Sequence, residues 1–127
     1  MLAMSLKRIL LPALALLAAT APGSARPTQS GFDGRWSVVI VTDAGTCDRS
    51  YRYGVAISRG RISYAGDSGV LVSGGVDPRG RVSVSLSYGQ AAAQGSGRLS
   101  GAAGEGRWQG ASSGARCSGR WLAERRD

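Results

Sequence analysis

The chain has 127 residues, a formal net charge of +8 and no histidine. This length allows one domain at most. The absence of histidine removes the commonest general base, metal ligand and pH switch, and it excludes a Ser–His or Cys–His catalytic pair. We therefore expect a protein that is not an enzyme and that holds neither a metal nor a cofactor.

Residues 1–25 have the three-part form of a secretory signal peptide. Lys7 and Arg8 form a charged start, residues 9–19 form an apolar run, and small residues at 23–25 form a cleavage site. The apolar run is too short to span a bilayer core of about 30 Å. The sequence therefore predicts cleavage after Ala25, a periplasmic or secreted protein, and no transmembrane segment in the mature chain.

The remaining chain divides into a polar tether over residues 26–31 and one domain over residues 32–127. In this domain, apolar and polar residues alternate in short segments that turns separate, a pattern typical of strands with one buried face. The expected strands cover residues 32–41, 51–58, 62–64, 70–76, 82–88, 91–100, 106–110 and 117–123. Short connections favour antiparallel neighbours. The sequence thus predicts an all-β fold: about eight short strands in an up-and-down meander, closed or nearly closed into a small barrel.

The inner face of this predicted barrel is uneven. The first five strands supply branched and aromatic side chains, whereas the last three supply mainly Ala and Gly, with Leu99, Trp108 and Trp121. We expect Trp36, Tyr53, Trp108 and Trp121 to form the aromatic core. Three tryptophans bring a large volume to a barrel that is just wide enough for side chains, so a solid core is predicted. The alternative is a cavity walled by the tryptophans and tyrosines.

The two cysteines are expected to form a disulfide, Cys47–Cys117, because exported proteins fold in an oxidising compartment. Two free thiols are the alternative. In a closed meander, Cys47 precedes the second strand and Cys117 begins the eighth. The two residues should therefore lie close together at the same end of the barrel.

The unit Gly-Arg-Trp occurs three times, at residues 34–36, 106–108 and 119–121. A unit that recurs in this way indicates a structural repeat, one per strand or hairpin. Together with the signal peptide, the Thr46-Cys47-Asp48 loop and the tail over residues 117–126, it resembles small secreted β-barrel proteins of alphaproteobacteria. The resemblance covers most of residues 32–126 and implies no function.

The architecture is also similar to bacterial eight-stranded barrels that inhibit secreted metalloproteases. Those proteins carry an early Gly-x-Trp and one disulfide. The bridge expected here joins the two ends of the barrel sequence, whereas the bridge of that family is short and early.

Arginines are expected to gather on the outer face at one end of the barrel. Arg35, Arg61, Arg81 and Arg107 begin odd-numbered strands, and Arg98 lies near the end of an even-numbered strand. A rim of guanidinium groups suits bidentate contact with phosphate or carboxylate. The alternative is a rim that only keeps the surface soluble. Asp43, Asp48 and Asp67 lie in loops at the opposite end, where solvated turn residues are a simpler interpretation than a Ca²⁺ site.

The sequence therefore predicts a small exported binding protein, monomeric, that contacts anionic envelope lipid, polysaccharide or an acidic protein through its Arg-rich rim. The alternative is a carrier of a small apolar ligand at the barrel mouth, or an inhibitor of a secreted enzyme. Nucleic acid binding is disfavoured, because stacking requires exposed aromatic rings and the alternation places nearly all of them inward.

Overall fold

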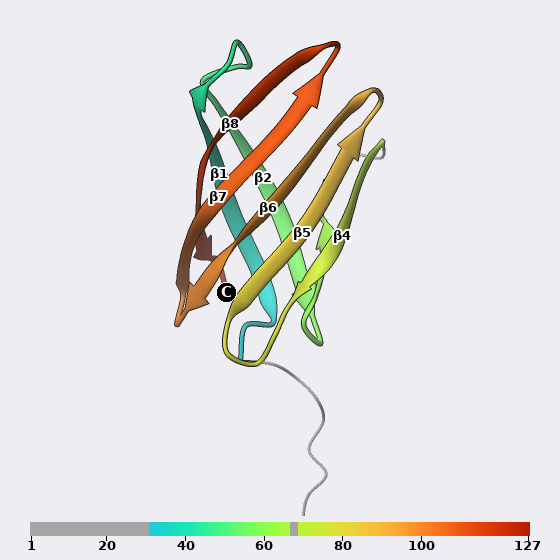
Figure 1. The fold of residues 1–127 in the computed structure, drawn as a ribbon. Coiled ribbons are helices and arrows are strands. Elements are labelled where there is room, and N and C mark those ends of the chain that lie inside the picture. The colour runs from blue at the N-terminus through green and yellow to red at the C-terminus, as the bar shows by residue number, and fades with distance from the viewer. Residues whose placement is uncertain (1–30, 67–68) are drawn as a thin grey trace, which may run out of the picture.

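The structure is a computed structural model that describes residues 31–66 and 69–127. The predicted signal peptide and most of the predicted tether lie outside the described residues. Eight antiparallel strands form a closed barrel in meander order, which confirms the predicted fold (Figure 1). They are β1 (Gly34–Ala44), β2 (Ser50–Ser58), β3 (Arg61–Tyr64), β4 (Val70–Val76), β5 (Arg81–Tyr88), β6 (Ala91–Ser100), β7 (Ala103–Ser112) and β8 (Ala115–Arg125).

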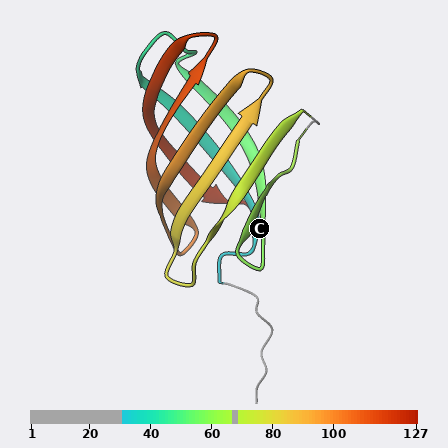
Figure 2. The same cartoon turned by 45° about the vertical axis from the view of Figure 1, so that its right-hand side comes forward.

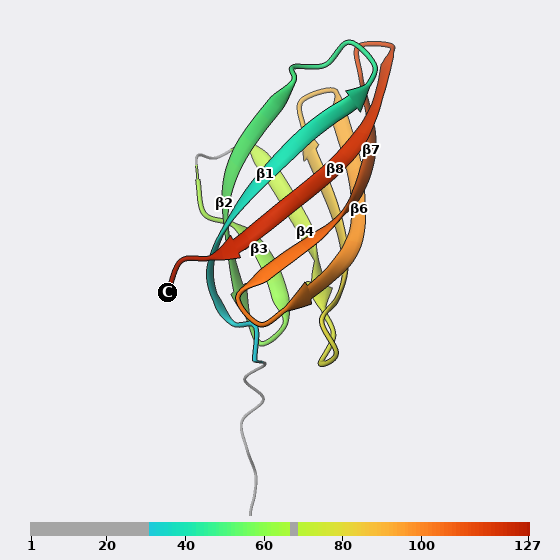
Figure 3. The same cartoon turned by 90° about the vertical axis from the view of Figure 1, so that its left-hand side faces the viewer.

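The barrel has two ends, which we call lower and upper as they stand in Figures 1 and 2. The lower end holds the start of β1, the β2–β3, β4–β5 and β6–β7 turns, and the end of β8. The upper end holds the β1–β2, β5–β6 and β7–β8 connections. The first and last strands lie side by side (Figure 3), and they pair from Trp36 opposite Arg125 to Ala44 opposite Ser118.

A hydrophobic core fills the lower half of the barrel. Its buried members all occupy inward positions of the predicted alternation: Trp36, Ile57, Ile62, Val76, Val82, Leu99, Trp121 and Ala123. Phe32 packs against this cluster and approaches the β4–β5 turn at Gly80. The Arg125 guanidinium lies 5.2 Å from the Trp36 ring centroid and donates to the carbonyl oxygens of Asp33 and Gly31. The lower end is therefore closed by side chains.

Two of the three Gly-Arg-Trp units pair with each other across β7 and β8. Gly106 lies opposite Trp121, and Gly119 lies opposite Trp108. The Trp121 indole donates to a backbone carbonyl of β6 (3.1 Å), and the Trp108 indole donates to a backbone carbonyl of β1 (2.9 Å). The Trp121 ring crosses Gly106, since a Cβ there would lie 2.5 Å from the ring, whereas a Cβ on Gly119 would first meet the backbone of β1 at Val41. The two copies of the repeat are therefore paired in register, and the glycine of one copy leaves room for Trp121 of the other.

The seam between β3 and β4 differs from the other seams of the barrel. The two strands share one paired position, Arg61 opposite Gly75, and the Val76 amide donates to the carbonyl oxygen of Gly60 (2.7 Å). β4 is fully paired with β5 on its other side, from Val70 to Val76. The upper part of β4 therefore has a strand partner on one side only among the described residues.

Candidate functional site

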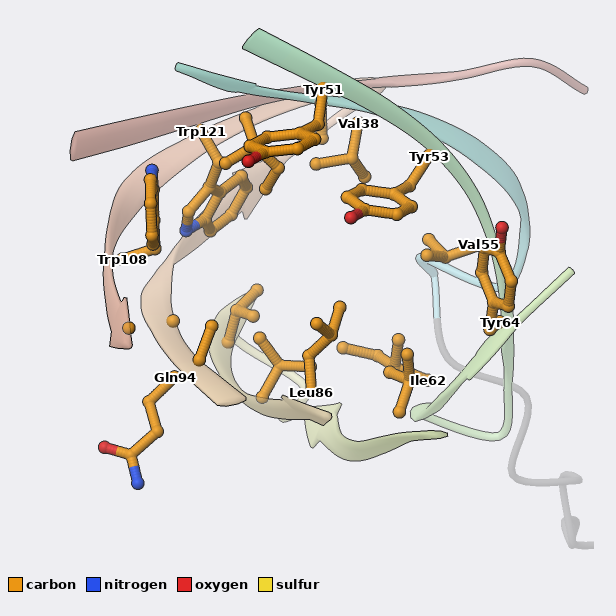
Figure 4. A pocket seen from close by; sticks show the side chains of 18 of the residues that line it. Val38, Tyr51, Tyr53, Val55, Ile62, Tyr64, Leu86, Gln94, Trp108 and Trp121 are labelled. Carbon is orange, nitrogen blue, oxygen red and sulfur yellow. The ribbon is translucent and has the colours of Figure 1, made fainter. Parts of the chain in front are cut away.

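An apolar cavity of about 360 Å³ lies inside the barrel. Figure 4 shows aromatic and aliphatic side chains around a central space, with the Gln94 side chain pointing away from it. The prediction of a solid core is therefore wrong, and the alternative, a cavity walled by the tryptophans and tyrosines, agrees with the structure; the buried residues of the lower half form the floor of this cavity. The volume equals that of about twelve water molecules at ~30 Å³ each, and pockets for small molecules begin near 300 Å³.

The cavity exists because small residues occupy the inner face of the upper half. Ala91 and Ala93 of β6 and Gly110 of β7 line it, and none of them reaches the barrel axis. Inward aliphatic residues at this level, such as Ile40 and Val84, stay partly exposed although they face the interior. Their partial exposure shows that water has room beside them, and the lining continues to Cys47, Ala91 and Ser112 at the upper end.

Aromatic rings form one wall of the cavity. Tyr51 and Tyr53 of β2 are stacked, with ring centroids 6.3 Å apart, and Tyr64 of β3 meets Tyr53 edge-on at 5.9 Å. Such offset and edge-to-face pairs favour fixed ring positions. Trp108 and Trp121 add two further rings from β7 and β8 (Figure 4). A flat or extended apolar molecule would therefore meet rings that are already held in place.

The disulfide fixes one side of the upper end. Cys47 and Cys117 are bonded, which confirms the predicted bridge, and it ties the β1–β2 loop to the start of β8. The buried Thr42 hydroxyl donates to the carbonyl oxygen of Asp48 (2.6 Å), and the Thr42 amide donates to that of Arg49 (2.9 Å). Cys47 itself lines the cavity, so the bridge forms part of its mouth.

The predicted aromatic core residues divide between two roles. Trp36 and Trp121 are buried in the lower core, although both also border the cavity floor. Tyr53 and Trp108 are partly exposed and form the cavity wall. Tyr51 and Tyr64 were not among the predicted core aromatics, but the alternative prediction of a cavity walled by tryptophans and tyrosines includes them, and both line it.

Four of the five predicted anion-binding arginines, Arg35, Arg61, Arg81 and Arg98, are exposed at the lower end as predicted, and Arg107 is not at that end. Arg81 lies opposite Arg98 across β5 and β6, and Arg107 lies opposite Arg120 across β7 and β8. We call these four exposed residues on adjacent strands the arginine row. Glu105 of β7 lies opposite Arg98 and so enters the row as a negative charge.

Arg35 and Arg61, the two remaining candidates, stand outside the arginine row. The Arg35 guanidinium is paired with the carboxylate of Asp127 (3.0 Å) at the lower end, and Arg61 lies on β3. Arg120, which the prediction omitted, is on the same register line as Arg107.

Arg107 also departs from its predicted position at the lower end. It lies in the middle of β7, because this strand begins at Ala103 rather than at Gly106 as predicted. Its charge reaches Asp43 near the upper end of β1. The pKa of Asp43 is lowered, first by hydrogen bonds from Arg120 and then by the charges of Arg120, Arg107 and Arg49.

The acidic residues of the upper end do not form a metal site in the described part of the chain. Asp43 accepts two hydrogen bonds from Arg120, at 3.0 and 3.1 Å. Within residues 31–66 and 69–127, no three Cys, Asp or Glu side chains come together as metal ligands. Asp67, which the sequence placed near Asp43 and Asp48, lies outside the described residues.

In the described residues, no helix has the length and apolarity needed to cross a membrane. No family model, curated protein or solved structure matches the chain.

Proposed function

We propose that this protein is a small exported, non-catalytic binding protein that holds a small apolar molecule in the cavity of its barrel. The single observation that carries the proposal is the apolar cavity of about 360 Å³, walled by aromatic rings and extending to the upper end. Concave sites with apolar and aromatic walls are the usual form of small-molecule sites. The disulfide supports a location outside the cytoplasm, in the periplasm or beyond it.

The cavity reverses the order of the two functions that the sequence suggested. A solid barrel would leave only the outer surface for binding, and the arginines would then be the strongest feature. With a closed lower end and a hollow upper half, the molecule instead offers an interior from which water can be displaced. Removing apolar ligand surface from water contributes roughly 25 cal/mol per Å².

Filling the cavity should weaken this binding. Ala93 lies on the inner face of β6, opposite Leu86 and Gly110, so Ala93→Trp places an indole in the space. We expect the affinity for the neutral probe N-phenyl-1-naphthylamine to fall by about tenfold or more, since overpacking costs about 1–3 kcal/mol. The rise in probe fluorescence on titration with the mature protein measures the affinity.

Gln94→Trp is the matched control for this experiment. It introduces the same indole one residue further along β6, where the side chain points away from the cavity (Figure 4). The control should bind the probe as the unchanged protein does. Equal affinities for all three proteins, or no fluorescence rise with any of them, would contradict the proposed function.

A second function is supported by the arginine row. Four guanidinium groups on adjacent strands, Arg81, Arg98, Arg107 and Arg120, could contact phosphate or carboxylate groups of envelope lipid, polysaccharide or an acidic protein. Glu105 and Asp43 offset part of this charge. We propose anionic lipid as the partner, because an extended row on one side of a barrel suits a flat charged surface.

Binding to lipid vesicles tests this second function. The triple change of Arg81, Arg98 and Arg107 to Gln should weaken binding to phosphatidylglycerol vesicles by about a hundredfold, at about 1 kcal/mol per charge, as sedimentation with the vesicles measures. Raising the salt concentration should also weaken the binding of the unchanged protein to these vesicles. Arg35→Gln removes one charge outside the row, so its effect should stay below about fivefold. If neither salt nor the triple change alters the binding, the arginine row has no part in binding lipid.

A further inference from the structure

The cavity wall contains no charged side chain among the described residues. Its polar side chains are those of tyrosine, tryptophan, Gln94 and Ser112, and the Gln94 side chain points outward (Figure 4). An ionised group that entered this space would lose its water without gaining a counter-charge, which is costly in an apolar site. The wall is therefore complementary to an uncharged molecule.

The indole donors of the wall are already used within the protein. Trp36 Nε1 donates to the carbonyl oxygen of Phe32 (2.8 Å), Trp108 Nε1 to that of Val41 (2.9 Å), and Trp121 Nε1 to that of Ser96 (3.1 Å). Each bond holds its ring against the barrel wall. A ligand would meet the faces and edges of these rings and not their N–H groups.

The Tyr53 hydroxyl is the exception. It has no hydrogen-bond partner among the described residues, whereas the neighbouring Tyr51 hydroxyl accepts from the Asp48 amide (3.2 Å). Figure 4 shows the Tyr53 oxygen directed toward the central space and the Tyr64 oxygen directed away from it. Burial, followed by the neighbouring Tyr51 and Tyr64, raises the pKa of Tyr53, so the phenol stays protonated and able to donate at neutral pH. The Tyr53 O–H is thus a donor directed toward a largely apolar interior.

We propose that the cavity selects neutral ligands that have an apolar body and one oxygen acceptor, such as a carbonyl, which receives the Tyr53 O–H. This inference rests on the proposed cavity-binding function and adds the chemical class of the ligand. The aromatic rings contact the body of the ligand, and Tyr53 fixes its orientation. Carboxylates of the same size are excluded, because the wall offers them no cation.

Three naphthalenes of similar shape test the proposal by displacing N-phenyl-1-naphthylamine. 2-Acetylnaphthalene has one acceptor, 2-ethylnaphthalene has none, and 2-naphthoate is an anion. We expect Tyr53→Phe to lower the affinity for the ketone by about 3- to 10-fold, the range of one net hydrogen bond. The affinity for the ethyl compound should change by less than about twofold. In the unchanged protein, naphthoate should bind at least about tenfold more weakly than the ketone.

Tyr64→Phe is the matched control, because it removes a hydroxyl of the same cluster that points away from the space (Figure 4). It should leave all three affinities unchanged. Naphthoate binding as tight as the ketone, or a Tyr53→Phe change that weakens the ketone and the ethyl compound equally or neither of them, would overturn the inference. If the probe itself does not bind, the proposed function is wrong. If the probe and 2-ethylnaphthalene bind but Tyr53→Phe does not change the affinity for the ketone, only the proposed ligand class is wrong.

Discussion

Trp121→Ala is expected to destabilise the barrel by about 3–5 kcal/mol, the usual cost of removing a large aromatic side chain from a packed core. Trp121 is 6% exposed, and its ring lies against Gly97 and Gly106. Its indole also donates to the carbonyl oxygen of Ser96 on β6. The change therefore opens a void in the lower core and removes a hydrogen bond that spans three strands. Urea denaturation followed by circular dichroism measures the loss.

Trp108→Ala provides the comparison, because this ring is partly exposed and borders a space that already exists. We expect a smaller loss, of about 1–3 kcal/mol, since the lost packing is one-sided and the indole bond to Val41 is the main interaction removed. The difference between the two changes measures how unequally the two halves of the barrel are packed. Equal losses would show that the upper half is as solid as the lower half.

Removal of the disulfide is expected to cost about 4 kcal/mol, within a usual range of 2–5 kcal/mol. Cys47 and Cys117 are 70 residues apart, so the bridge restrains almost the whole barrel sequence in the unfolded chain. Cys117 is 4% exposed, so alanine is the better replacement at both positions because it buries no hydroxyl group. The measurement is the denaturation midpoint of the doubly substituted protein beside that of the oxidised parent.

The reduced parent is the control for this measurement, since it keeps both side chains and loses only the bond. It should unfold at nearly the same denaturant concentration as the double variant. Identical midpoints for the oxidised and reduced parent would mean that the bridge adds nothing to stability. Such a result would attribute the fixed position of the β1–β2 loop to the Thr42 hydrogen bonds alone.

The strands and their inward faces could be predicted because the alternation in this chain is unusually regular. Residues such as Tyr51, Tyr53, Val55 and Ile57 can face inward only together, since a one-residue shift would expose all of them. The closure of the barrel by β1 and β8 could also be predicted from the cysteines, because an even number of meander strands brings the β1–β2 loop and the start of β8 to the same end. The inward faces and the closure depend only on the two-residue alternation and on the order of the strands along the chain.

The cavity could not be predicted in the same way. Alternation assigns a face to Trp108, but it does not say whether the ring crosses the barrel axis or lies along the wall. The ring is held at the wall because the Val41 carbonyl oxygen accepts its N–H. The predicted position of Arg107 was wrong for a related reason, since β7 begins three residues earlier than predicted and Arg107 therefore lies in the middle of the strand.

The sparse pairing between β3 and β4 gives the barrel an uneven resistance to thermal fluctuation. Where a seam has many ladder hydrogen bonds, as between β1 and β8, separating the strands breaks most of them at once. Where it has one paired position, separation breaks only the pairing of Arg61 with Gly75 and the adjacent hydrogen bond from Val76 to Gly60. Native-state openings of lowest free energy should therefore occur at this seam, without unfolding of the rest. Backbone amides of β3 would then exchange with solvent through a sub-global opening, while those of β7 and β8 report the stability of the whole domain.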